Sequence, residues 1–102
     1  MVLRTAGFLL GVMILFLACG DAAQQGPIDA KSIFEKKCSL CHGNDGKLQL
    51  AQASDLSISK LSLEERINII SNGKNTMAPF KVVLSEEEIK AVALYIEQLR
   101  IP

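Results

Sequence analysis

The segment Cys38-Ser39-Leu40-Cys41-His42 constrains this chain more than any other feature. Two cysteines separated by two residues, with a histidine directly after the second, form the attachment signature of c-type haem. On a helical turn, residues i and i+3 point the same way, so both thiols can reach the two vinyl groups along one porphyrin edge. The signature therefore predicts one covalent haem c, bonded to Cys38 and Cys41, with His42 as an axial ligand of the iron.

Two other kinds of site contain a Cys-x-x-Cys pair, namely redox dithiols and zinc sites. A tetrahedral zinc site needs four ligands, but the chain has one histidine and only one further cysteine, Cys19. A thioredoxin-like dithiol should lie near a βαβ pattern, which is not visible here. Haem attachment is therefore the favoured interpretation.

The first 19 residues are predicted to be an export signal. Arg4 supplies a positive charge before the short, charge-free apolar run 7–17, which is the pattern of a secretory signal. A membrane-spanning helix needs about 20 apolar residues, so this run is too short. The sequence Phe-Leu-Ala-Cys ending at Cys19 resembles a bacterial lipobox, which predicts cleavage before Cys19 and its lipidation. The alternative is ordinary cleavage a few residues later, after Ala22 or Ala23.

The predicted division of the chain is a signal at 1–19, a short tether at 20–28 and one domain at 29–102. The mature protein is expected to be exported, in the periplasm or on the outer face of the cytoplasmic membrane, with a lipid anchor on Cys19. The formal net charge is zero and aromatic residues make up 5% of the chain. With no basic tract, this composition argues against a nucleic-acid partner.

The domain is predicted to be all-α, because no stretch shows convincing strand alternation. Asp29 is a suitable N-cap for a first helix that runs into the cysteine motif and stops near 42–43. Two capping boxes, beginning at Ser62 and Ser85, start the later helices. The helix that begins at Ser62 ends at 72–73, and the helix that begins at Ser85 extends to about Arg100. The third helix carries an apolar stripe at helical spacing, formed by Ile89, Val92, Ala93, Ile96 and Leu99.

Met77 is predicted to be the second axial ligand. A lone methionine is normally core filler, but Met77 lies in a loop after the helix-ending Gly73. It follows His42 by 35 residues, so the chain can pass round a haem and offer sulfur to the opposite face. The other methionines are in the leader, and Lys74 or Lys81 could bind iron only in an altered state. Histidine and methionine are a recurring pair of haem ligands.

These motifs, in this order, resemble a small bacterial monohaem class I cytochrome c over about residues 29–99. The resemblance is carried by 38–43, 55–56, 73–80 and 84–96. It implies the cytochrome c fold, with three main helices around one haem and with the first and last helices crossing at Phe34 and Tyr95.

Two positions depart from the family pattern. Ala30 stands where relatives often have glycine at the helix crossing, which implies a slightly wider contact. Ser54 stands where many relatives have proline, in the loop whose carbonyl receives the second nitrogen of the ligand histidine. Some carbonyl is expected to orient His42, because a ligating histidine nearly always donates its other proton. The sequence does not indicate which one.

The predicted function is single-electron transfer, since six bound ligands leave no open position on the iron for a substrate. The protein is then an electron carrier and not an enzyme. Two alternatives remain open. One is a haem sensor or peroxidase-like enzyme in which Met77 dissociates, and the other is an electron-entry subunit of a larger oxidoreductase.

The expected partners are redox proteins, together with the membrane that holds the lipid anchor. Five lysines flank the haem motif and the Met77 loop, and they predict a basic rim that steers an acidic partner. Scattered, solvated lysines are the alternative explanation. The five are Lys36, Lys37, Lys47, Lys74 and Lys81.

Overall fold

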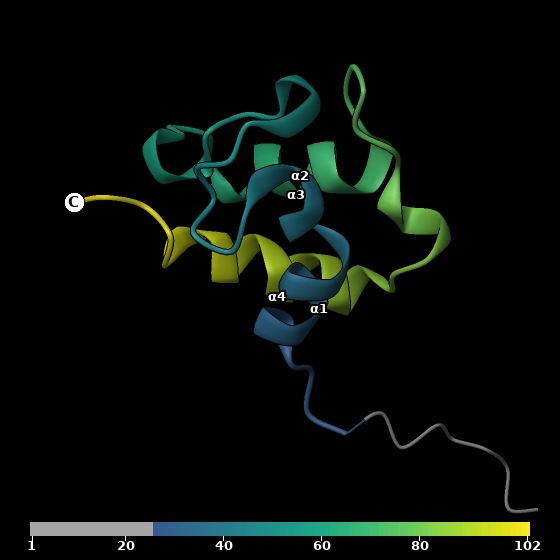
Figure 1. Ribbon diagram of the computed structural model, residues 1–102. Helices are drawn as coiled ribbons and strands as arrows, with labels where there is room; N and C mark the ends of the chain where they lie inside the picture. Colours follow the sequence, from purple (N-terminus) through teal and green to yellow (C-terminus); the bar gives the residue numbers. More distant parts are fainter. Residues whose placement is uncertain (1–25) are drawn as a thin grey trace, which may run out of the picture.

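The computed structural model describes residues 26–102. The predicted signal, most of the tether and Cys19 lie outside the described residues. Within these residues, four α-helices and three short 3-10 turns follow one another (Figure 1). They are α1 (Ala30–Lys37), α2 (Ser39–His42), η1 (Leu50–Gln52), η2 (Leu56–Ile58), α3 (Leu63–Asn72), η3 (Phe80–Val82) and α4 (Glu86–Glu97). Residues 26–102 contain no β-strand, only one isolated bridge between Lys74 and Met77.

The three predicted helix starts are confirmed. The Asp29 carboxylate accepts a hydrogen bond from the Ser32 N–H at 3.0 Å and so caps α1. Ser62 and Ser85 each begin a complete capping box, in which the serine hydroxyl and the glutamate three residues later satisfy each other's backbone N–H groups. Because these bonds satisfy N–H groups that a helix leaves free at its start, they fix where α3 and α4 begin.

The first helix is interrupted at Cys38, a break that the sequence did not predict. The Cys38 N–H still donates to the Phe34 carbonyl at 2.8 Å, which closes the last turn of α1. The next carbonyl, that of Glu35, accepts the Ser39 hydroxyl instead, at 2.5 Å. Serine side chains compete with the backbone in this way. The cysteine motif consequently lies on a short separate helix, α2.

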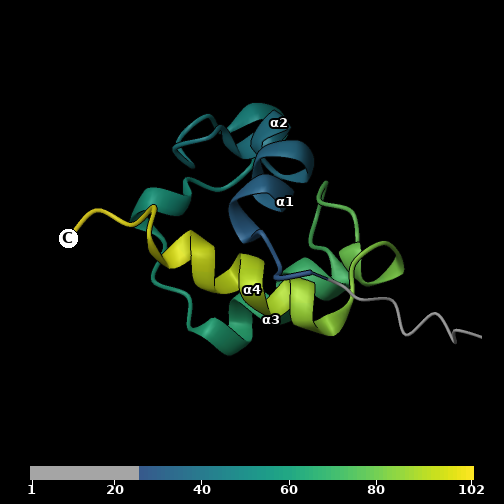
Figure 2. The ribbon, with the colours of Figure 1, turned by 90° about the horizontal axis from the view of Figure 1, so that it is seen from below.

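The core lies where α4 packs against both α1 and α3 (Figure 2). The rings of Phe34 and Tyr95 meet at this crossing, with centroids 5.3 Å apart and planes inclined by 51°. This contact confirms the predicted crossing of the first and last helices. α4 ends at Glu97, before the predicted Arg100, but a further turn brings Leu99 against the core. The buried apolar side chains are Phe34, Cys38, Ile70, Leu84, Ile89, Val92, Ala93 and Ile96.

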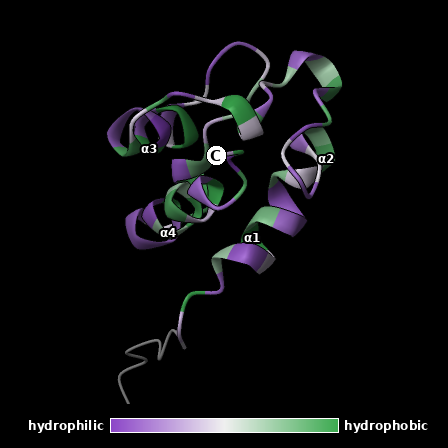
Figure 3. Cartoon of the chain, turned by 90° about the vertical axis from the view of Figure 1, so that its left-hand side faces the viewer, coloured by the Kyte–Doolittle hydropathy of each residue, from purple (hydrophilic) through white to green (hydrophobic). Residues whose placement is uncertain are grey.

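A buried arginine joins α3 to α4. The Arg66 side chain is almost fully buried, and it donates to the Ala93 carbonyl and to the Glu97 carboxylate. Desolvation alone would raise the pKa of Glu97, but Arg66 and Arg100 together outweigh it and hold this pKa below its usual value. Viewed from the side, α3 and α4 form one half of the molecule and α1 with α2 the other (Figure 3).

Candidate haem-binding site

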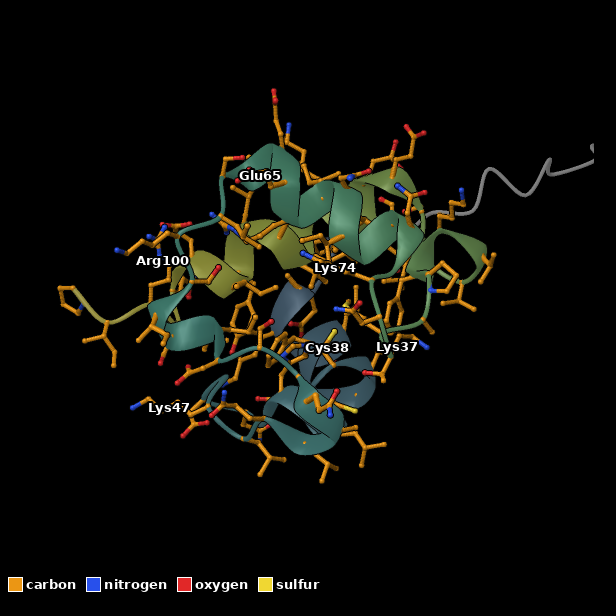
Figure 4. The ribbon with its side chains drawn as sticks, turned by 90° about the horizontal axis from the view of Figure 1, so that it is seen from above. Lys37, Cys38, Lys47, Glu65, Lys74 and Arg100 are labelled. Atoms are coloured by element: carbon orange, nitrogen blue, oxygen red, sulfur yellow. The ribbon has the colours of Figure 1, made fainter. Side chains whose placement is uncertain are left out.

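The two cysteines of the motif lie on one helical turn, as their spacing predicts. The Cys41 N–H donates to the Cys38 carbonyl at 3.3 Å, and both thiols are free. Cys38 is 8% exposed and belongs to the core, whereas Cys41 is half-buried. In Figure 4, Cys38 lies near the middle of the molecule, between α3 and the α2 segment. Cys38 therefore lies on the inner side of the motif, whereas Cys41 and His42 are partly open to solvent.

Burial changes the chemistry of the first thiol. It raises the pKa of Cys38 to about 11, and the nearby Lys37 lowers it only in part. Redox dithiols depend on a thiol whose pKa is lowered below its ordinary value. The pKa of Cys38 is instead raised, which argues against the dithiol alternative. Within residues 26–102, no group of three or more His, Cys, Asp or Glu side chains is placed to hold a metal ion.

The His42 ring is oriented by a backbone carbonyl 12 residues away. Its Nδ1 atom lies 3.0 Å from the Ser54 carbonyl oxygen. A carbonyl oxygen can only accept a hydrogen bond, so Nδ1 carries the proton and Nε2 keeps its lone pair for a metal. The orienting carbonyl thus comes from the residue that replaces the family's proline. The sequence indicated the loop that supplies this carbonyl but not the residue.

Backbone hydrogen bonds fold the loop after His42 back onto the motif. The Leu48 N–H donates to the His42 carbonyl at 2.9 Å, and the Leu56 N–H donates to the Gly46 carbonyl at 2.8 Å. Gly46 has φ +80°, and a Cβ there would lie 2.9 Å from the Leu56 Cβ. Glycine allows both this backbone angle and this close approach. The loop can therefore bring the Ser54 carbonyl back to the histidine.

Met77 lies on a four-residue hairpin at the end of α3. The Met77 N–H donates to the Lys74 carbonyl at 2.9 Å, and the Lys74 N–H donates back at 3.2 Å. Asn75, at the bend, has φ +54°, a left-handed angle that asparagine tolerates better than most residues. The Met77 side chain is half-buried and packs against the core. The hairpin therefore fixes the position of the Met77 backbone, from which the thioether side chain extends.

Gly73 lets this hairpin lie against the end of α3. Its φ is +75°, and a Cβ at this position would lie only 2.4 Å from the Met77 carbonyl oxygen. The sequence indicated a helix-ending glycine, and the structure adds this second requirement. No pattern in the sequence revealed the close backbone contact.

The donor set fits haem c. Two free thiols lie one helical turn apart, and an imidazole with a fixed tautomer follows directly. A thioether on a separate loop completes the set, and histidine with methionine is a known axial pair. Large apolar side chains are exposed on α2 and on the segments that follow it, where a bound porphyrin could cover them. They include Leu40, Leu48, Leu50 and Ile58.

Comparisons with known proteins also indicate a c-type cytochrome. The family profile described as "Cytochrome C oxidase, cbb3-type, subunit III" matches residues 26–96. Cytochrome c6 of Gracilaria tenuistipitata is 34% identical over 94 residues, which span 87% of this chain and 81% of that protein. A cytochrome c6-like protein of a Nostoc species is 33% identical over 100 residues, which span 87% of this chain and 89% of that protein.

Solved structures of similar proteins share the fold. Cytochrome c6C from a Synechococcus species superposes with a TM-score of 0.60 at 31% identity, covering 68% of this chain and 90% of that one. Cytochrome c6 from the diatom Phaeodactylum tricornutum superposes with a TM-score of 0.57 at 30% identity, covering 70% and 91%. The predicted all-α cytochrome c fold is confirmed.

Proposed function

This chain belongs to the cytochrome c family, and we propose that His42 and Met77 are the axial ligands through which it works as a carrier of single electrons. It is a cytochrome c6-like electron carrier with one covalent haem c, and not an enzyme. Cys38 and Cys41 are the proposed attachment residues. The observation that carries the proposal for His42 is the contact between its Nδ1 and the Ser54 carbonyl, because this contact leaves Nε2 free to bind iron.

Each of these residues has a distinct task. The bound haem supplies an iron that alternates between its ferrous and ferric forms. The Ser54 carbonyl keeps the His42 ring in one orientation and makes its free nitrogen more basic. The Met77 thioether is a soft donor that favours ferrous iron, so it raises the reduction potential relative to a second histidine. With both ligands bound, no position is left for a substrate.

Replacing Met77 tests this proposal. The ferric holoprotein should show a sulfur-to-iron charge-transfer absorption band, which both Met77→Ala and Met77→Leu should lose. Leucine keeps a similar apolar volume, so loss of the band in Met77→Leu reports the missing sulfur and not a cavity. Leu94→Ala, at an exposed position of α4, is the matched control and should keep the band. A band that persists in both Met77 variants contradicts the ligand assignment.

Carbon monoxide distinguishes the carrier from a sensor or peroxidase-like protein. The ferrous wild-type protein should resist carbon monoxide at neutral pH, because Met77 occupies the position that this ligand needs. Rapid binding would favour the alternative in which Met77 dissociates.

The family description also suggests a second role, that of an electron-entry subunit in an oxidase. The chain would then be held in a larger membrane complex. Mild detergent extraction of the native membrane, followed by size separation, tests this role. Migration of the haem protein at its own small size supports the free carrier, whereas co-migration with a terminal oxidase supports the subunit.

We also propose that a basic rim guides the carrier to its redox partner. The side chains of Lys36, Lys37, Lys47, Lys74 and Lys81 are all exposed. Figure 4 labels Lys37 and Lys47 on the α2 side and Lys74 on the α3 side. Charges so placed should steer an acidic partner and speed its association. Transfer rates that do not change with ionic strength would contradict the steering proposal.

The proposed location is outside the cytoplasmic membrane, with Cys19 lipidated. The described part of the chain contains no helix that is both long and apolar enough to cross a membrane. Mass spectrometry of the native protein tests the location and the haem together. The expected mass combines a haem on residues 38–41 with acyl chains on Cys19. An N-terminus at 23 or 24 without lipid would instead support ordinary signal cleavage.

A further inference from the structure

One side-chain hydrogen bond connects the loop of Met77 to the loops that follow His42. The Thr76 hydroxyl donates to the Ala51 carbonyl at 3.0 Å, across 25 residues of sequence. Thr76 directly precedes Met77, and Ala51 lies in η1. Within residues 26–102, it is the only side-chain hydrogen bond from residues 74–79 to another segment. The two bonds between Lys74 and Met77 shape the hairpin but do not connect it to the His42 side.

The acceptor segment is unusual in its backbone. Gln49, Ala51 and Gln52 have φ of 55°, 52° and 66°, although none is glycine. Such angles are unfavourable for residues with a Cβ, and they persist only where surrounding contacts hold them. The segment packs against α2, the helix that ends at His42. The Ala51 carbonyl therefore offers an anchor connected to the His42 side of the molecule.

We propose that Thr76 is a positioning residue that keeps Met77 on the iron by fastening the hairpin to the Ala51 carbonyl. This inference rests on the proposed ligation by Met77. A methionine thioether has no proton to donate, so a carbonyl cannot orient it as the Ser54 carbonyl orients His42, and its sulfur is only a weak hydrogen-bond acceptor. The hairpin must be held by its backbone and by its neighbours, and Thr76 supplies the hydrogen bond that reaches across.

Removing this hydroxyl should increase the fraction of molecules in which Met77 has left the iron. A net hydrogen bond of ordinary strength corresponds to about a fivefold change in such an equilibrium. An external ligand that competes with Met77 binds in proportion to the open fraction. Its apparent affinity therefore measures how firmly the hairpin is held.

The experiment compares four holoproteins, namely wild type, Thr76→Val, Thr76→Ser and Ser59→Ala. Valine keeps the branched shape of threonine without the hydroxyl, and serine keeps the hydroxyl. Ser59 accepts a hydrogen bond from the Leu61 N–H at 3.3 Å, so Ser59→Ala removes a comparable bond that does not involve the Met77 hairpin. Imidazole is titrated into the ferric proteins, and carbon monoxide binding is timed in the ferrous proteins.

Thr76→Val should bind imidazole about fivefold more tightly than wild type, and it should bind carbon monoxide faster by a similar factor. Thr76→Ser should stay within about twofold of wild type, and Ser59→Ala should match wild type. Equal affinities in Thr76→Val and wild type would overturn the proposal. A similar gain in Ser59→Ala would also overturn it, because general loosening of the fold would then explain the effect.

These outcomes are independent of those that test the ligand itself. If Met77 is not a ligand, the charge-transfer band is missing from the wild type or survives in Met77→Leu. If Met77 is a ligand but Thr76 does not position it, Met77→Leu loses the band while Thr76→Val behaves as wild type.

Discussion

His42 is held by hydrogen bonds to residues several positions away in the sequence, whereas Met77 is held on a hairpin of four residues. The His42 carbonyl accepts from the Leu48 N–H, and the His42 ring contacts the Ser54 carbonyl. Met77 exchanges its two backbone hydrogen bonds with Lys74 alone. Segments fixed by few contacts open at a lower free-energy cost than segments fixed by many. We therefore expect the methionine to be the ligand that leaves first.

The chemistry of the two side chains explains this difference. An imidazole has two nitrogens, so one can bind metal while the other donates to a carbonyl that sets its direction. A thioether sulfur has no proton to donate and accepts hydrogen bonds only weakly. The chain can therefore position His42 through its side chain, but it positions Met77 mainly through the backbone of its hairpin. Gly73 and Thr76 are the residues that provide this backbone placement.

The largest effect is expected for Gly73→Ala. The added methyl group would lie 2.4 Å from the Met77 carbonyl oxygen and would also sit at φ +75°. The left-handed backbone and the overpacking together should cost about 2–4 kcal/mol. Most of this cost should be relieved by displacement of the hairpin, so the ferric charge-transfer band should be lost. Absorption spectra and carbon monoxide binding measure the change.

Gly46→Ala is the matched variant on the His42 side. It is strained in a similar way, because its Cβ would lie 2.9 Å from the Leu56 Cβ at φ +80°. It should lower the thermal unfolding midpoint but keep the band. If Gly46→Ala loses the band as readily as Gly73→Ala, the two ligand segments are not held differently.

A smaller effect, in the stabilising direction, is expected for Ser54→Pro. Ala53 has φ −59° and ψ 142°, the extended conformation that a residue before proline prefers. Within residues 26–102, the Ser54 N–H makes no backbone hydrogen bond that proline would remove. Proline also keeps the carbonyl that orients His42. The free energy of unfolding should rise by about 0.5–1 kcal/mol, as measured by thermal denaturation of the holoprotein. A lower midpoint would show that Ser54 cannot adopt the backbone angle of proline.

The smallest effect concerns α3, the helix that leads to Met77. The backbone hydrogen bond from Ser62 holds the pKa of Glu65 below its usual value of 4.5. A depressed carboxylate pKa stabilises the fold above the unfolded-state pKa, and this contribution is lost as the pH falls through the folded-state pKa. Glu65→Gln removes the charge and keeps a capping side chain. Wild type should unfold at a higher temperature than Glu65→Gln above pH 5, and the difference should shrink below pH 4.5. A constant difference would contradict this.

Much of the fold was predictable because its signals are local. Asp29, Ser62 and Ser85 cap helices through hydrogen bonds to residues three positions later, so their patterns can be read along the chain. The break at Cys38 was not predictable in this way. It depends on whether the Ser39 hydroxyl or the Ser39 N–H pairs with the Glu35 carbonyl, and both choices are compatible with the same residues.

The order of residues alone determined which atoms this chain can offer to a haem. Two thiols at a spacing of three and an imidazole directly after them have their relation fixed by the geometry of one helical turn. Only the tertiary structure decided how the side chains that carry those atoms are positioned and oriented. The Ser54 carbonyl, the Gly73 contact and the Thr76–Ala51 hydrogen bond join groups whose meeting depends on the path of the backbone between them. Hydrogen bonds and close contacts act over a few ångströms, so their partners are set by where the folded chain returns and not by sequence spacing.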